Sequence, residues 1–118
     1  MRYIWLGLLC ATSPAFAHEA VIEGATATKS GTGWSVSVTL SHAEVGWEDY
    51  ADGWRVETDA GDILGTRVLH HPHVDEQPFT RSLSGVAVPD GVQTLWLRAR
   101  TSVEGWAQAR FQLELPSE

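Results

Sequence analysis

The chain has 118 residues and a formal net charge of −7, from 8 Lys or Arg against 15 Asp or Glu. This length suits one small domain, and so acidic a chain, with Lys29 as its single lysine, lacks the basic surface needed to bind nucleic acid or an anionic membrane. Hydrophobic residues make up 43% of the sequence and 6 are Trp, so the composition is that of a folded protein, not a disordered one.

Residues 1–17 are predicted to be a secretory signal peptide. Arg2 provides a positive start, residues 4–11 are apolar but too short to span a bilayer, and Ala15-Phe16-Ala17 matches the small-x-small cleavage pattern. Cleavage after Ala17 leaves residues 18–118 as a single domain with no membrane span. It also removes Cys10, the single cysteine, so the exported domain has no disulfide. The expected location is the bacterial periplasm or the outside medium.

The exported part of the chain reads as a series of short strands. Between Trp34 and Leu40, apolar and hydroxyl side chains alternate with the period of two that marks a strand with one buried face. Turn signals such as Asp59-Ala60-Gly61-Asp62 separate such segments. We predict strands at 20–28, 34–40, 54–58, 63–69, 79–88, 94–101 and 109–115, and a short helical turn within 43–50. About seven strands with these turns predict an all-β antiparallel sandwich of immunoglobulin or fibronectin III type.

Strand parity in such a sandwich predicts where the histidines lie. Successive strands run in opposite directions, so alternate loops return to the same end of the domain. The chain start, the loop after the second strand and the loop after the fourth strand then share one end. All five histidines fall on these segments, and three tryptophans are expected beside them: Trp47, Trp54 and Trp106.

The His70-His71-Pro72-His73 segment suggests a metal site. In an extended chain His71 and His73 point the same way and can reach one ion. Neutral imidazoles suit copper, zinc or nickel, and with no cysteine or nearby methionine the site favours Cu(II), zinc or nickel over Cu(I).

Cleavage would make His18 the first residue, which can chelate through its amine and its ring Nδ1. A further imidazole from the 70–73 segment would complete three nitrogens in the arrangement that Cu(II) prefers. Asp75 and Glu76 can supply oxygens or orient the rings, and Arg81 can pair with either of them. The alternative is a polar loop whose imidazoles pack on tryptophan or cap backbone groups.

Other chemistries have weaker signals. Glu48, Asp49 and Asp52 match no calcium-loop spacing, so a solvated acidic loop is expected there. The aromatic side chains at this end, Tyr50 among them, can present faces to a sugar or a peptide, or can cover the end of the core. Trp34 and Trp96 are expected to cover the other end. No phosphate loop, G-x-S-x-G motif or thiol nucleophile is present in the exported part, so catalysis is disfavoured, although a copper site with an open position could carry out redox chemistry.

The stretch from Gly65 to Ser82, GTRVLHHPHVDEQPFTRS, resembles a segment of small exported bacterial proteins of unassigned function, with further similarity at 47–54 and at Gly105-Trp106. This resemblance implies a distinct exported family and no activity. A looser likeness, based on His18, chain size and a distal histidine, is to periplasmic copper carriers with an N-terminal histidine on a β-sandwich. Their late Asp-x-His pattern is absent, since residues 102–105 read Ser-Val-Glu-Gly.

Two functions follow from the sequence. The first is a periplasmic metal-binding module, for copper or else zinc, with His18, His70, His71 and His73 as ligands. The second is an interaction module without metal, which binds a periplasmic protein or a glycan through an acidic, tryptophan-rich end.

Overall fold

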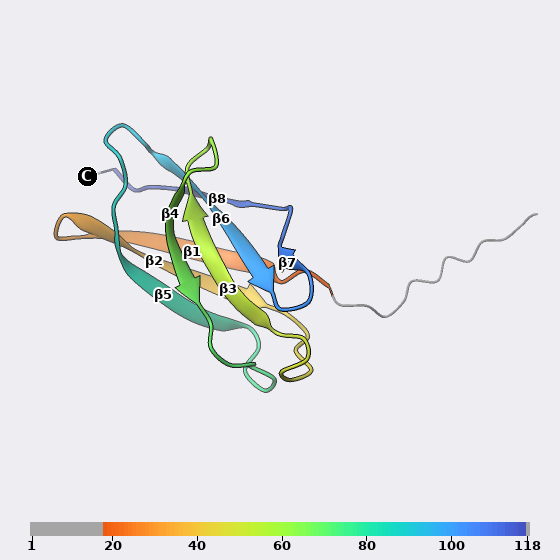
Figure 1. Ribbon diagram of the computed structural model, residues 1–118. Helices are drawn as coiled ribbons and strands as arrows, with labels where there is room; N and C mark the ends of the chain where they lie inside the picture. The colour runs from red at the N-terminus through yellow and green to blue at the C-terminus, as the bar shows by residue number, and fades with distance from the viewer. Residues whose placement is uncertain (1–17, 118) are drawn as a thin grey trace, which may run out of the picture.

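The computed structural model describes residues 18–117, which form eight strands and no helix (Figure 1). The predicted signal peptide lies outside the described residues. The all-β prediction is confirmed, and none of the described residues forms a helix that could cross a membrane. The strands are β1 (Val21–Ser30), β2 (Gly33–Ser41), β3 (Ala51–Glu57), β4 (Ile63–Val68), β5 (Phe79–Val86), β6 (Thr94–Thr101), β7 (Gly105–Trp106) and β8 (Phe111–Glu114).

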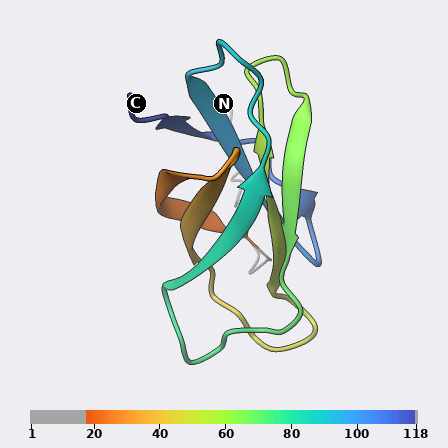
Figure 2. The same cartoon turned by 90° about the vertical axis from the view of Figure 1, so that its left-hand side faces the viewer.

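The strands form two antiparallel sheets. One sheet has three strands in the order β1-β2-β5. The other has five, in the order β4-β3-β6-β7, with β8 also paired to β6. Figure 2 separates the layer of β1, β2 and β5 from β3 and β4. The predicted two-sheet antiparallel arrangement is therefore confirmed.

The core lies between the sheets because burial alternates along the strands. In β2 and β6 every second residue is buried, as the period of two predicts. Each large apolar side chain buried there contributes roughly 1.5–3 kcal/mol by leaving water. The side chains that fill this space include Val36, Val38, Leu40, Trp54, Val56, Phe79, Leu95 and Leu97.

Two local predictions are wrong. Residues 43–50 form no helical turn, because Gly46 has a φ of 122°, which no helix contains, and its carbonyl accepts the N–H of Asp49 in a tight turn. Residues 105–106, expected in a loop, form the short strand β7 beside Thr101 and Arg100. Pairing with β6, not local periodicity, makes this segment a strand.

A buried carboxylate holds the outer face of the five-stranded sheet. Glu57, only 1% exposed, ends β3 and pairs with three guanidiniums. Arg98 approaches at 2.8 Å, Arg55 at 2.7 Å and Arg110 at 3.2 Å. Arg98 also donates to the carbonyl of Ala107, at 2.7 Å. One carboxylate thus connects β3, β6 and the segment that leads into β8.

The same contacts set the acidity of Glu57. Burial raises its pKa, but hydrogen bonds from Arg98, Arg55 and Arg110 lower it by more, to about 2 instead of 4.5. The unfolded chain takes up this proton near pH 4.5, whereas the folded chain does so only near pH 2. The stabilisation is therefore complete above about pH 4.5 and is lost as the pH falls toward 2.

We predict that the free energy of unfolding falls by about 3 kcal/mol from this group alone between pH 4.5 and 2. Glu57→Gln removes this step and costs roughly 3–5 kcal/mol at pH 7, because three guanidiniums then surround an uncharged group. Urea unfolding across this pH range measures both effects. The control is Glu114→Gln, an exposed position expected to change stability by less than about 0.5 kcal/mol. Equal effects of the two variants would contradict the assignment.

Candidate functional site

Four segments meet at one end of the sandwich, which we call the loop end: residues 18–20, 42–50, 69–78 and 102–104. The strand registers place them there. Val21 pairs with Ser41 and Leu40 with Phe79, so the first three segments start or finish side by side. On the other sheet Ala51 pairs with Thr101. In Figure 1 the 42–50 and 69–78 loops lie together at the bottom. The segments that carry the five histidines share one end, as strand parity predicts.

A buried histidine–glutamate pair lies at the centre of the loop end. His42 is 6% exposed and Glu44 is 8% exposed. The Nδ1 of His42 lies 2.9 Å from Oε2 of Glu44, and its Nε2 lies 2.9 Å from the carbonyl oxygen of His18. A carbonyl oxygen and a carboxylate both accept, so the two hydrogen bonds form together only when both ring nitrogens donate.

Glu44 extends this pair into a network. Its Oε2 accepts the backbone N–H of Ala51 at 2.6 Å, and its Oε1 accepts that of His73 at 2.7 Å. Gln77 adds a contact, because its Oε1 accepts the N–H of His42 at 2.9 Å. The carboxylate therefore fixes both long loops and the beginning of β3 relative to one another, and through His42 it also fixes residues 18–20.

His73 packs into the domain. Its ring stacks on Phe79 with centroids 4.0 Å apart and an interplanar angle of 13°, and its Nδ1 is buried without a hydrogen-bond partner in the described chain. Burial lowers the pKa of His73, and the nearby Arg81 guanidinium lowers it further. The lowered pKa favours the neutral ring, which serves as a packing surface for Phe79.

His70 and His71 remain at the surface. Both are exposed, and their ring centroids lie 6.4 Å apart. The ring of His71 also meets Trp47 edge-on at 6.4 Å, and Trp47 meets Tyr50 at 5.5 Å. His18 is exposed, and its backbone carbonyl holds His42.

Among residues 18–117, no three His, Cys, Asp or Glu side chains are arranged to hold one metal ion. The structure brings His70 and His71 together and directs His73 toward Phe79. Metal binding by the predicted ligand set stays a prediction.

The three tryptophans predicted at this end have different environments. Trp47 is 66% exposed, whereas Trp54 is fully buried in the core and has no surface for a ligand. Trp106 is half-buried beneath the guanidinium of Arg55, whose central carbon lies 4.0 Å from the ring centroid. Trp34 is buried as expected, whereas Trp96 lies on the outer face of its sheet beside Arg110.

Of the predicted acidic residues, Asp75 is exposed and Glu76 pairs with Arg81 at 3.2 Å, as the sequence suggested. The hydrogen bond from Arg81 lowers the pKa of Glu76. This exposed ion pair braces the 69–78 loop and contributes little to stability.

The loop end also exposes aliphatic side chains that sequence patterns did not identify as a site. Val45, Val74 and Val103 are 65%, 51% and 54% exposed and come from three different loops. Val68, at the end of β4, is 51% exposed. Isolated valines between polar loop residues carry no periodic signal, so only the fold shows that they share one end with Trp47.

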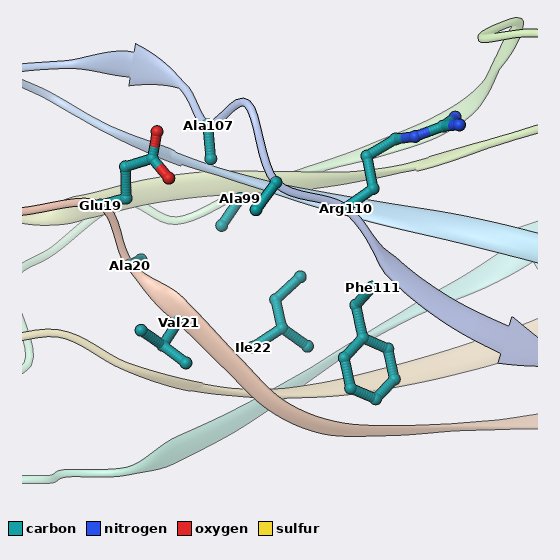
Figure 3. Close-up of a pocket in the computed structure, with 9 residues that line it drawn as sticks. Glu19, Ala20, Val21, Ile22, Ala99, Ala107, Arg110 and Phe111 are labelled. Atoms are coloured by element: carbon teal, nitrogen blue, oxygen red, sulfur yellow. The ribbon is translucent and has the colours of Figure 1, made fainter.

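A separate hollow lies between the start of β1 and the β7–β8 segment (Figure 3). It has a volume of about 200 Å³ and a mostly apolar lining. In Figure 3, Val21 and Ile22 line one side and Phe111 the other, with Glu19 and Arg110 at the rim. This groove follows the edges of the two sheets and contains none of the predicted site residues.

Comparison with known proteins gives one similar sequence. The chain is 40% identical over 86 residues to a protein of Halomicrobium mukohataei described as a "Putative lipoprotein". The shared region is 73% of this chain but 42% of that protein, so the chain spans less than half the length of this relative. No family model and no solved structure matches the chain.

We predict that Glu44→Gln destabilises the protein by roughly 3–5 kcal/mol, because it disrupts a buried hydrogen-bond network and turns an amide N–H₂ toward backbone donors. Urea unfolding at pH 7 measures the change. The control is Glu48→Gln, an exposed neighbour in the same loop, with an expected change below about 0.5 kcal/mol. Similar midpoints for the two variants would show that the Glu44 network does not organise the loop end.

Proposed function

We propose that the protein is an exported, non-catalytic binding module that recognises a protein partner through its loop end. Its sheet pairing, β1-β2-β5 against β4-β3-β6-β8, agrees with a sandwich of fibronectin III type. In that architecture loops from alternate strands gather at one end and present a composite surface on a rigid scaffold. The proposal rests on the exposure of Trp47, Val45 and Val74 on two loops that Glu44 holds together. Val103 is exposed on the 102–104 loop, where Ser102 hydrogen-bonds to Tyr50.

The chemistry of this surface favours a protein over a glycan. Sugar sites need open aromatic faces surrounded by hydrogen-bonding groups, whereas three of the exposed apolar residues here are valines. Exposed apolar side chains that gather at one place are typical of protein interaction sites. Trp47 is the natural anchor, because tryptophan dominates binding energy at such interfaces.

The charge of the loop end indicates the partner's charge. The loops 42–50, 69–78 and 102–104 contain six Asp or Glu and no Lys or Arg. Opposite charges speed association and fix orientation more than they add affinity. The partner surface is therefore expected to be apolar at its centre with lysine or arginine around it.

Two observations support export to the cell envelope or beyond. Residues 1–17 have the order of a signal peptide, with Arg2 before an apolar stretch and Ala15-Phe16-Ala17 at its end. The Halomicrobium mukohataei relative is described as a lipoprotein, which is a description of an envelope protein.

Site-specific photocrosslinking in cells that produce the protein tests this function. A photoreactive residue at Val74 is expected to capture one predominant protein, and Trp47→Ala is expected to reduce that product by about tenfold or more. The same group at Ile63, which is 54% exposed at the opposite end of the sandwich, is the matched control. Identical products at both positions, or a product insensitive to Trp47→Ala, would refute the proposal.

A second candidate function, binding of copper or else zinc, has one specific observation in its favour. The exposed rings of His70 and His71 have centroids 6.4 Å apart, which is the upper limit for two imidazoles that share one ion and corresponds to ligands on opposite sides of it. His18 could add its terminal amine after cleavage, and His73 would first have to leave Phe79. The site would then hold the metal at the surface of the loop end.

Titration of the exported protein with Cu(II) and Zn(II) tests this candidate. Binding tighter than about micromolar, or roughly 8 kcal/mol, is expected. His70→Asn with His71→Asn should weaken it by about tenfold or more, whereas His73→Asn should have little effect. Affinity weaker than micromolar, or equal affinity after loss of both exposed histidines, would exclude this function.

A further inference from the structure

The outer face of the five-stranded sheet concentrates positive charge on an acidic protein. It carries four arginines, and within residues 18–117 the carboxylates that pair with them are Glu57 and Asp52. Within this cluster four guanidiniums meet two carboxylate partners, so positive charge exceeds negative there although the whole chain has a net charge of −7. The four arginines are Arg55, Arg98, Arg100 and Arg110.

Two of these arginines have most of their donors engaged. Arg98 donates through all three nitrogens, to Glu57 and to the carbonyls of Ala107 and Gln108. Arg110 donates to Glu57 and to two carbonyls of the β3–β4 turn. The hydrogen bonds of Arg98 and Arg110 therefore stabilise the fold.

The other two retain donors. Arg55 uses Nε for Glu57, and Arg100 uses Nη1 for Asp52. Their remaining guanidinium nitrogens make no hydrogen bond within the part of the chain that the structure describes. The Arg100 side chain is 40% exposed and that of Arg55 is 20% exposed. A ligand in solution can therefore reach the guanidinium groups of both Arg55 and Arg100.

The guanidiniums of Arg55 and Arg100 both lie close to the indole ring of Trp106. The central carbon of Arg55 lies 4.0 Å from the indole centroid and that of Arg100 lies 5.9 Å from it. Stacking on an indole restricts the guanidinium before a ligand arrives, which lowers the entropic cost of binding. The two central carbons are therefore at most about 10 Å apart, a span that a ligand with several anionic oxygens can bridge.

The position of Arg55 also places two positive charges opposite each other. Arg55 lies directly across from Arg98 in the β3–β6 register, and like charges in such a pair are destabilising. Glu57 offsets part of that repulsion. A bound anion would offset the rest.

We propose that Arg55, Trp106 and Arg100 form a binding site for a small multivalent oxyanion, a carboxylate or a phosphate or sulfate. Guanidinium donors match the oxygens of such groups in pairs, which gives charge-assisted hydrogen bonds. This site is on the sheet face and does not depend on what the loop end binds.

Calorimetric titration with citrate, phosphate and sulfate tests the site, with sodium chloride used to hold ionic strength constant. Wild-type protein is expected to bind at least one of these anions, and the anion bound distinguishes carboxylate from phosphate or sulfate recognition. Arg55→Gln combined with Arg100→Gln should weaken binding by about tenfold or more, because two sets of charge-assisted hydrogen bonds are lost. If this variant does not fold, Arg100→Gln alone serves.

The control removes the same charge elsewhere. The control variant combines Lys29→Gln with Arg81→Gln, two positions on the other sheet. Their side chains also lie over aromatic rings, Lys29 over Trp34 and Arg81 over Phe79. This variant should bind the anion within about twofold of the wild-type affinity, because salt screens the attraction between an anion and exposed charges on the other sheet. Equal weakening by both double variants would show attraction by overall charge only. Absence of binding to all three anions would also overturn the proposal.

Discussion

The carboxylate of Glu44 is the contact on which the loop end depends. It is buried, and it accepts N–H groups from His42, Ala51 and His73, which belong to three separate segments. A buried carboxylate is expensive unless its oxygens are satisfied, so these segments have little freedom to move apart. His42 also connects this network to residues 18–20, because its Nε2 lies 2.9 Å from the carbonyl oxygen of His18. The exposed apolar side chains of the loops are therefore held in place by a polar network beneath them.

A second buried carboxylate performs a similar role on the outer face of the five-stranded sheet. Glu57 gathers Arg55, Arg98 and Arg110, and the arginines in turn stack on tryptophans. Glu57 is the last residue of β3, whereas Glu44 lies in the loop between β2 and β3. The domain thus combines an apolar centre with two ionic clusters, and each proposed binding surface adjoins one of them.

Much of the fold was predictable because alternation of apolar and polar residues is local. The strand 94–101 was predicted with its observed bounds, and parity alone placed His18, His42 and the 70–73 segment at one end. The environment of each side chain was not predictable. Nothing in the sequence distinguishes His42, which is buried on Glu44, from the exposed His71, because partners 2 and 24 residues away decide it. The arginine cluster was missed for the same reason, since cross-strand register brings Arg55 to Arg98.

The Glu44 network organises the loop end before any partner binds. Amide hydrogen exchange of the free protein measures this directly at Ala51 and His73, whose N–H groups Glu44 accepts. The account predicts that both amides are protected nearly as well as those of the core strands, and that Glu44→Gln removes the protection of His73 while β2 and β6 keep theirs. Rapid exchange at His73 in the wild-type protein, at the rate of an open loop, would contradict it.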